Sequence, residues 1–397
     1  MGTNSTAGVA AAPSSALPEV QRQSREAERA EWRLIVLVAA TVAIWIGFHA
    51  WTGVFISPRN LSNLAVQATI TALMAAGLTW LLVAREIDLS VGSLLALCGV
   101  LSMQLMQTYG LDAITTILLV IVVGIAIGLL QGSLRVKLGI PSFIITLAGF
   151  SWLRGLAYVV SGAETLSGAG DTFYEIGNGE FPSWISLTAI LALSALYLFT
   201  WLRTYTGILG PQKRTLRPVS IAVLGLTLSA AGMSIWVFAW NQGIPYPLAL
   251  LLIIVFCMEF SAKNTRFGRY VYAIGGNPVS AKRAGIKVNT MILALFGLMG
   301  ALSALAAIVQ TSRLDAGPPG VGLFVNMSAI SAAIIGGTSL FGGEGRVVGA
   351  VLGALLMASI TNGLSLAGVD TFYQMIITGA LLIVAVTADH AAQQKAK

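Results

Sequence analysis

Charged and polar side chains interrupt a largely apolar chain at residues 85–93, which read Arg-Glu-Ile-Asp-Leu-Ser-Val-Gly-Ser. An oxygen of Asp88 or Ser90 can accept the free N–H groups at the start of the apolar run that follows, which is the usual role of such residues as helix N-caps. The alternative is a functional helix break beside a transport path, formed by Asp88, Ser90 and Gly92.

A second break lies at residues 336–345, which read Gly-Gly-Thr-Ser-Leu-Phe-Gly-Gly-Glu-Gly between two apolar runs. Glycine-rich interruptions in corresponding places of two halves indicate the moving centre of a transporter. We therefore compare 85–93 with 336–345, although the two sequences match too weakly to establish a repeat. The candidate residues of the second break are Gly336, Gly337, Gly342 and Gly343.

A third polar segment, residues 261–289, contains the pattern of a short capped helix. Asn277 suits the N-cap, Pro278 the first helical position and Gly285 the C-terminal cap. These residues predict about two helical turns over 278–284, outside the membrane. A helix this short is unstable alone in water, so it must pack on its own protein or on a partner. A plain connecting loop is the alternative.

The sequence contains no recognisable set of catalytic or metal-binding residues. His49 and His390 have no companion ligands, while Cys98 and Cys257 lie in apolar runs where they fit buried small side chains. No nucleophile, base and acid form a recognisable set. None of the lysines precedes Ser or Thr, so the chain lacks the phosphate-binding pattern G-x-x-x-x-G-K-[ST].

The composition indicates which solvent surrounds the elements that position these segments. The chain has 397 residues, of which 56% are hydrophobic and 10% are charged, whereas a soluble domain carries about 25% charged residues. Continuous apolar runs favour membrane helices over a barrel. We predict an all-α polytopic membrane protein with about 10–12 transmembrane helices. The runs are 34–55, 64–83, 91–108, 113–134, 141–160, 184–202, 219–239, 246–260, 290–311, 325–341, 347–366 and 372–388, of which the third, eighth and tenth are short.

The basic residues predict the orientation. With a cytoplasmic N-terminus and twelve crossings, every Lys and Arg except Arg59, Arg154 and Arg313 falls inside, and the outer loop 161–183 is acidic. Both termini are then cytoplasmic. The domains are a tail of residues 1–33, a membrane domain of residues 34–388 and a tail of residues 389–397. The net charge of +7 fits this asymmetry better than nucleic-acid binding.

Glycines recur at four-residue spacing in two places, as Gly124, Gly128 and Gly132 and as Gly345, Gly349 and Gly353. Small side chains let helix backbones approach closely in lipid. We predict close helix packing there rather than a ligand site.

Four segments together resemble the permeases of ABC importers, in the branch that carries ribose, arabinose, galactose and xylose. The segments are Ile87–Ser93, Gly139–Leu147, Ala273–Ile286 and Ile335–Gly343, in order within a resemblance covering residues 60–388. An extra stretch around 184–245, with the basic turn Lys213-Arg214, is similar to xylose-type permeases. The runner-up is a twelve-helix secondary transporter driven by an ion gradient, which usually keeps acids inside its spans; here they are almost absent.

The resemblance implies a transport subunit of the bacterial inner membrane that is not itself an enzyme and holds no cofactor. It would form a homodimer, bind a separate ATPase subunit that carries ATP-Mg, and receive sugar from a periplasmic binding protein. Residues 261–289 would be the cytoplasmic coupling loop. Its contact residues would be Gly276, Asn277, Pro278, Ala281, Lys282, Arg283, Ala284 and Gly285.

Polar side chains inside the apolar runs are candidates for the sugar path, since they face either a partner helix or a watery cavity. Their hydroxyls and amides can exchange hydrogen bonds with a passing sugar, and helix–helix hydrogen bonds are the alternative. The candidates are Gln67, Thr71, Ser142, Thr146, Asn326, Ser328, Ser331, Thr361 and Asn362.

Overall fold

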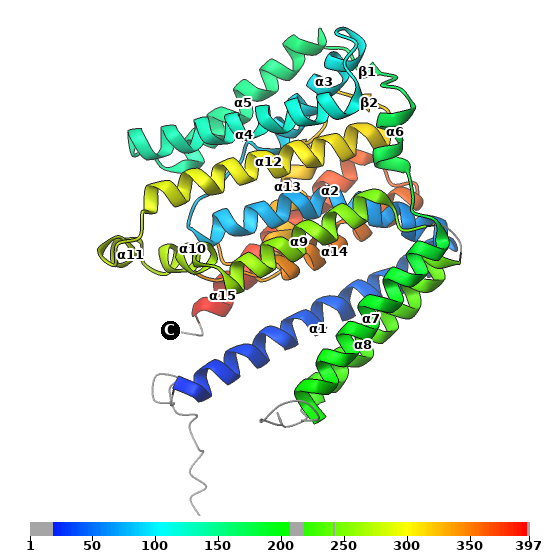
Figure 1. Cartoon of the computed structure of the whole chain (residues 1–397), viewed down its shortest axis with the longest axis vertical. Coiled ribbons are helices and arrows are strands. Elements are labelled where there is room, and N and C mark those ends of the chain that lie inside the picture. The colour runs from blue at the N-terminus through cyan, green and yellow to red at the C-terminus, as the bar shows by residue number, and fades with distance from the viewer. Residues whose placement is uncertain (1–18, 207–217, 241–242, 395–397) are drawn as a thin grey trace, which may run out of the picture.

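The computed structural model describes residues 19–206, 218–240 and 243–394, and these residues are almost entirely helical (Figure 1). Within them, nine apolar stretches are long enough to cross a membrane. They lie in α1 (Glu19–Thr52), α2 (Pro58–Val83), α4 (Ala113–Leu138), α5 (Ser142–Ser161), α7 (Ser183–Thr206), α8 continued by the π-helical turn η2 (Pro218–Ser234, Ile235–Ala239), α9 (Tyr246–Asn264), α12 (Val288–Leu314) and α14 (Val347–Leu366).

Three further apolar helices are shorter: α3 (Val91–Gln107), α13 (Leu323–Ile335) and the first part of α15 (Thr371–Gln394). All twelve predicted runs are therefore helical, and the all-α membrane fold is confirmed. Small elements lie between them: α6 (Asp171–Asn178), α10 (Arg266–Gly276), α11 (Pro278–Arg283), and the antiparallel pair β1 (Leu166–Ser167) and β2 (Ala316–Gly317).

Several predicted boundaries differ from the structure. The eighth run is not short, because α9 spans 19 residues. The tenth ends at Ile335, since Gly337 takes a left-handed conformation and terminates α13. The helix backbone of α1 covers 19–33 of the predicted N-terminal tail, and α15 runs past 388 to Gln394. Residues 1–18, 395–397 and the turn Lys213-Arg214 lie outside the described residues.

The interior is formed by α2, α12 and α14 with the short α3 and α13, while α1, α7 and α8 stand to one side (Figure 1). The predicted glycine ridges pack closely. Gly124 and Gly128 lie against the backbone of Gly300 and Phe296 in α12, and Gly349 lies against Gly336. A side chain at these glycines would overlap the neighbouring backbone, so the prediction of close helix packing is confirmed for them. Gly345 lies in the loop before α14 and is not part of a helix–helix contact.

An internal repeat appears in the packing. The series α2–α5 and α12–α15 both run long, short, long, long, and the contacts correspond: α2 packs on α14 as α12 packs on α4, and α3 packs on α5 as α13 packs on α15. The two series run in opposite directions, since α2 ends and α12 begins at the α10–α11 end (Figure 1). This is an inverted repeat of the kind found in transporters.

The repeat corrects the expected pairing of the two breaks. Residues 84–90, between α2 and α3, correspond to 315–322, between α12 and α13, and not to 336–345. Each corresponding break has a left-handed residue within its first two positions, Arg85 (φ 65°) and Asp315 (φ 49°). The breaks meet where the backbones of Gly92 and Gly322 touch without room for a Cβ. The sequence comparison missed this pairing because these two segments share backbone conformation rather than residues.

Candidate functional site

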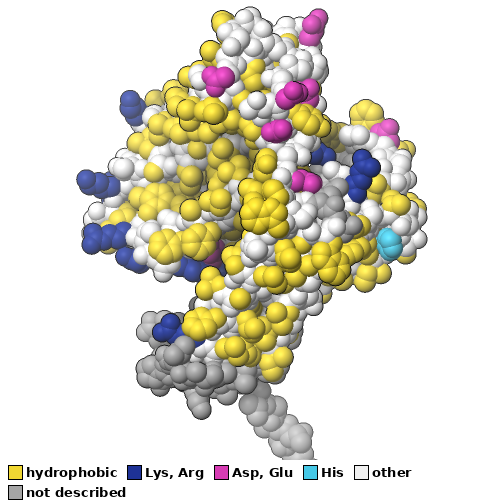
Figure 2. Space-filling model, turned by 45° about the vertical axis from the view of Figure 1, so that its right-hand side comes forward, with side chains coloured by type: hydrophobic (Ala, Val, Ile, Leu, Met, Phe, Trp, Pro, Cys, Tyr) yellow, Lys and Arg dark blue, Asp and Glu magenta, His cyan; other side chains and the backbone are white. Residues whose placement is uncertain are grey.

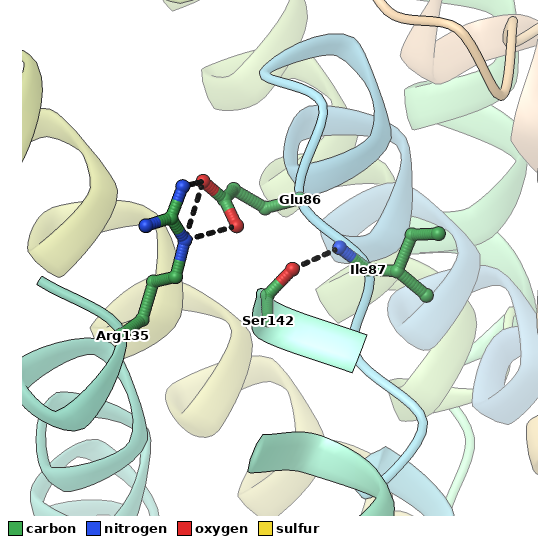
Figure 3. A network of polar contacts seen from close by, with 4 residues as sticks. All are labelled: Glu86, Ile87, Arg135 and Ser142. Atoms are coloured by element: carbon green, nitrogen blue, oxygen red, sulfur yellow. Dashed lines mark hydrogen bonds and ion pairs between the residues drawn. The ribbon is translucent and has the colours of Figure 1, made fainter. Parts of the chain in front are cut away.

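Residues 84–90, which we call the linker segment, cross between α2 and α3. The N–H groups of residues 84–86 still bond back to the last turn of α2, and the rest of the segment lies outside both helices. Neighbouring helices supply partners for its backbone. The N–H of Ile87 donates to Ser142 Oγ (3.0 Å; Figure 3), and the N–H of Leu89 donates to Thr146 Oγ1 (3.1 Å). Because buried backbone groups in lipid need internal partners, these hydroxyls fix the linker segment in place.

Asn326 Nδ2 supports the same segment from α13, donating to the Leu89 carbonyl (2.9 Å). Three predicted path residues, Ser142, Thr146 and Asn326, are thus buried and bonded to the linker segment. Their contacts match the alternative of helix–helix hydrogen bonds.

The sequence predicted that Asp88 or Ser90 caps α3, and neither side chain does so. Asp88 Oδ1 accepts the N–H and Oγ–H of Ser90 (2.8 and 2.7 Å), and Ser90, at the N-cap position, makes no side-chain cap hydrogen bond. Gln131 Nε2 of α4 donates to Ser90 Oγ (2.9 Å) and extends the buried network. Burial raises the pKa of the Asp88 carboxyl to about 6, although the hydrogen bonds from Ser90 act in the opposite direction.

Glu86 forms an ion pair that the sequence did not reveal. Arg135, in the last turn of α4, reaches both carboxylate oxygens through Nε (3.1 and 3.0 Å) and one through Nη2 (3.0 Å), as Figure 3 shows. The Glu86 side chain is only 5% exposed. The sequence analysis counted Arg135 only among the bases of the inner loops. It could not pair Arg135 with Glu86, because the two residues are 49 positions apart.

The linker segment also joins the two other polar segments. Arg85 donates from Nε to the Gly275 carbonyl (2.6 Å) and from Nη2 to the Gly276 carbonyl (2.9 Å), both at the end of α10. The N–H of Gly343 donates to the Val83 carbonyl (2.9 Å). The breaks at 85–93 and 336–345 and the loop 261–289, which the sequence singled out separately, therefore meet at one end of the molecule.

Two further contacts tighten this meeting point. Tyr272 donates its hydroxyl to the Gly345 carbonyl (2.6 Å). A Cβ at Gly275 would overlap the Val83 carbonyl oxygen and the Gly343 nitrogen, whereas one at Gly276 would meet nothing within 4 Å. Gly275 is thus a residue that the sequence analysis missed. Its only sequence signal is the Gly275-Gly276 pair, which does not say which glycine is constrained.

The predicted capped helix is present as α11. Asn277 Oδ1 accepts the N–H groups of Val279 and Ser280 (3.0 Å each), and Pro278 is the first helical residue. Gly285, at φ 84°, ends the helix in a Schellman motif, with the N–H of Ile286 on the Ala281 carbonyl (3.1 Å). All three capping assignments are confirmed.

The packing of α11 separates its inner and outer faces. Ala281 is buried against the protein itself, whereas Val279 is 61% exposed and Lys282, Arg283 and Ala284 are exposed. Ala281 therefore anchors the helix. The outer face is free in this chain to contact another protein.

Other predicted path residues surround a cavity of about 220 Å³ between α2, α12, α13 and α14. Four of the candidates line it: Gln67, Thr71, Ser328 and Thr361. Asn362 lies behind, with Nδ2 3.5 Å from Gln67 Oε1 and Oδ1 accepting from Asn60 Nδ2 (2.9 Å). The remaining candidate, Ser331, is buried elsewhere, and its Oγ has no hydrogen-bond partner among the described residues.

The cavity also contains Gln310 and Arg313, which the sequence analysis did not select. Both lie near the end of α12, beside α6, where the N–H of Gly177 donates to Ser312 Oγ. The cavity thus lies towards the end of the molecule opposite α10 and α11. Helical spacing was the available signal. Gln310 and Arg313 are three residues apart and Gln67 and Thr71 are four apart, so each pair lies on one face of its helix.

Charge is divided between the two ends. Figure 2 shows Lys and Arg along the left edge and again on the right, and Asp and Glu mainly at the top and right. The connections near α10 and α11 carry the bases, whereas α6 and its flanking loops carry acids. A multi-pass apolar bundle with an inverted repeat and a polar surface helix at one end defines a membrane transport subunit.

Comparison with known proteins identifies the family. Residues 60–386 match the family described as branched-chain amino acid transport system / permease component, and the chain belongs to it. The xylose transport system permease protein of Escherichia coli (strain K12) is 38% identical over 370 residues, covering 91% of this chain and 93% of that protein.

Two other relatives agree with this result. The xylose transport system permease protein of Haemophilus influenzae is 34% identical over 91% of this chain and 96% of its own length. The ribose import permease protein of Escherichia coli (strain K12) is 30% identical over 85% of this chain and 88% of its own length. No solved structure matches the chain significantly.

Proposed function

We propose that this chain is the permease subunit of a bacterial ABC importer that moves a monosaccharide into the cytoplasm. D-xylose is the first candidate for this sugar. The observation that carries the proposal is the meeting of the linker segment, the glycine loop 336–345 and the α10–α11 loop at one end. The similarity to xylose permeases over 91% of the chain supports the choice of sugar. The family's amino-acid description makes a branched-chain amino acid the second candidate.

The charge division supports a cytoplasmic position for the α10–α11 end and both termini, in the bacterial inner membrane. In this orientation the outer face of α11 meets a separate ATPase subunit that holds ATP-Mg. The acidic end receives a periplasmic sugar-binding protein. Two copies of the chain form the importer, and no cofactor or nucleic acid belongs to it.

The contacts of Arg85 suggest how movement passes inward. A displacement of α11 by the ATPase shifts the end of α10, and the two hydrogen bonds of Arg85 carry the shift to the linker segment. The linker segment is tied through Asn326 to α13. It therefore moves the breaks where α3 and α13 begin, at Gly92 and Gly322.

The cavity supports part of a sugar path. We assign Gln67, Thr71, Ser328 and Thr361 as direct contacts and Asn362 as the residue that orients Gln67. Ser142, Thr146 and Asn326 act on the path through the linker segment.

The test is reconstitution of the chain in vesicles with a candidate ABC ATPase and a candidate sugar-binding protein from the same organism. We expect xylose-loaded binding protein to stimulate ATP hydrolysis and sugar uptake together, and the mass of the purified complex to indicate two permease and two ATPase chains. Stimulation by leucine instead of sugars would favour the amino-acid candidate. Uptake driven by an ion gradient without ATP would refute the proposal.

A variant tests the coupling assignment. Glutamates at the exposed Val279 and Ala284 should abolish the stimulation while leaving the permease folded, because neither side chain is part of the core. Glutamate at Val54, which is 51% exposed at the opposite end, is the matched control. Unchanged transport in the Val279 and Ala284 variant would show that α11 does not receive the ATPase.

A further inference from the structure

Arg313 places a guanidinium in the wall of the cavity without a partner of opposite charge. Its side chain is half-buried, and no ion pair or hydrogen bond joins it to any residue in the described part of the chain. Two acids at this end of the molecule bind backbone groups instead: Asp315 accepts the N–H of Ala169 (3.1 Å), and Glu180 accepts that of Gly243 (3.0 Å). A charge withdrawn from water without a partner is costly, and an occupant of the cavity would offset this cost.

The other lining groups are uncharged. The amides of Gln67 and Gln310 offer both donors and acceptors, and the hydroxyls of three Ser and Thr residues offer the same. Phe324 and Met357 supply apolar surface. The volume of about 220 Å³ lies below the ~300–1,000 Å³ of pockets for drug-sized ligands, which restricts the cavity to small solutes.

We propose that this cavity is a solute-binding site within each subunit, in which Arg313 determines specificity by donating to oxygens of small hydroxylated solutes and excluding cations. This inference rests on the proposed function only for the identity of the solute as a sugar. The site itself is defined by the cavity and its single positive charge.

Two properties of the Arg313 guanidinium explain this specificity: it only donates hydrogen bonds, and its positive charge repels cations. A guanidinium has five N–H donors and no acceptor, so it matches the lone pairs of neighbouring hydroxyls. An ammonium group or a metal cation would meet a like charge in a confined, partly dry space, where Coulomb repulsion is stronger than in bulk water. An arginine in a transport path excludes protons and cations in the same way.

The test measures charge selectivity directly, without transport. A cysteine replaces Ser328 in the cavity, and Cys98 and Cys257 are replaced by alanine. The purified full chain is then treated with methanethiosulfonate reagents of similar size that carry either a sulfonate or a trimethylammonium group. We expect the anionic reagent to react roughly tenfold or more faster than the cationic one, and D-xylose at high concentration to slow both.

Matched variants assign this selectivity. Arg313→Gln should bring the two rates together, and Arg313→Glu should reverse their order. Arg59→Gln, which removes a base at the same end outside the cavity, should change nothing. A cysteine at the exposed Tyr109, also outside the cavity, should show no dependence on residue 313.

The outcomes separate this inference from the proposed function. The role of Arg313 would be overturned, whatever the chain transports, if the anionic and cationic reagents reacted at equal rates with the Ser328→Cys protein. It would also be overturned if Arg313→Glu left the ratio of the two rates unchanged. Charge selectivity without protection by D-xylose or ribose would overturn the cavity as a site for hydroxylated solutes. A reconstituted importer that moved no sugar would refute the proposed function but leave the charge selectivity intact.

Discussion

Replacing Gly275 with alanine tests the meeting of the three polar segments at its tightest point. The added Cβ would overlap backbone atoms of Val83 and Gly343, which have no side-chain rotamer to yield. The end of α10 must therefore move. Overpacking of this kind costs about 1–3 kcal/mol, and the movement also lengthens the Arg85 Nε hydrogen bond of 2.6 Å, which is worth roughly 1.5–3 kcal/mol because its donor is charged.

We therefore expect Gly275→Ala to lower the free energy of local opening by about 3 kcal/mol, near the lower end of the summed range because the neighbouring backbone can relax in part. Hydrogen exchange by mass spectrometry on the purified permease measures this as roughly 100-fold faster exchange over residues 266–286. Gly276→Ala is the control, because its Cβ would meet nothing within 4 Å and alanine in a helix is about 0.4–1 kcal/mol more stable than glycine. Equal exchange in the two variants would refute the reasoning.

Three further predictions follow from other contacts. Arg135→Gln leaves the buried Glu86 charge without its partner and should destabilise the fold by about 3–5 kcal/mol; thermal unfolding should show partial recovery on adding Glu86→Gln, and no recovery would argue against the pair. The raised pKa of Asp88 means that the folded state binds the proton more tightly than the unfolded state. The free energy of unfolding should therefore fall as pH rises from about 4 to 6 and stay level above. Asp88→Asn should flatten that pH profile, and an unchanged slope would assign the slope to another group. Asn277→Ala removes the cap of α11 and should cost about 0.5–2 kcal/mol, seen as faster amide exchange over 278–284 with global unfolding unchanged; protection equal to wild type would show that packing of Ala281 alone holds the helix.

Sequence patterns reached furthest where the physical cause was local. The caps of α11 depended only on Asn277, Pro278 and Gly285, because a cap is made between residues a few positions apart. Apolar runs located the twelve apolar helices that the described residues contain, since a segment in lipid must satisfy its own backbone. The prediction that Asp88 or Ser90 caps α3 was wrong because the two side chains bond to each other and Gln131, in another helix, donates to Ser90.

The pairing of distant segments was decided by the tertiary structure. The Glu86–Arg135 ion pair, the hold of Arg85 on Gly275, and the gathering of Gln67, Thr71, Ser328 and Thr361 around one cavity all join helices far apart in the chain. Helix packing in lipid is selected by shape, so polar side chains inside spans do not reveal which neighbour they face. The sequence alone determined that this chain is a helical membrane transport subunit with a capped surface helix. The packing decided which polar residues brace its moving parts and which ones, Arg313 among them, face an open cavity.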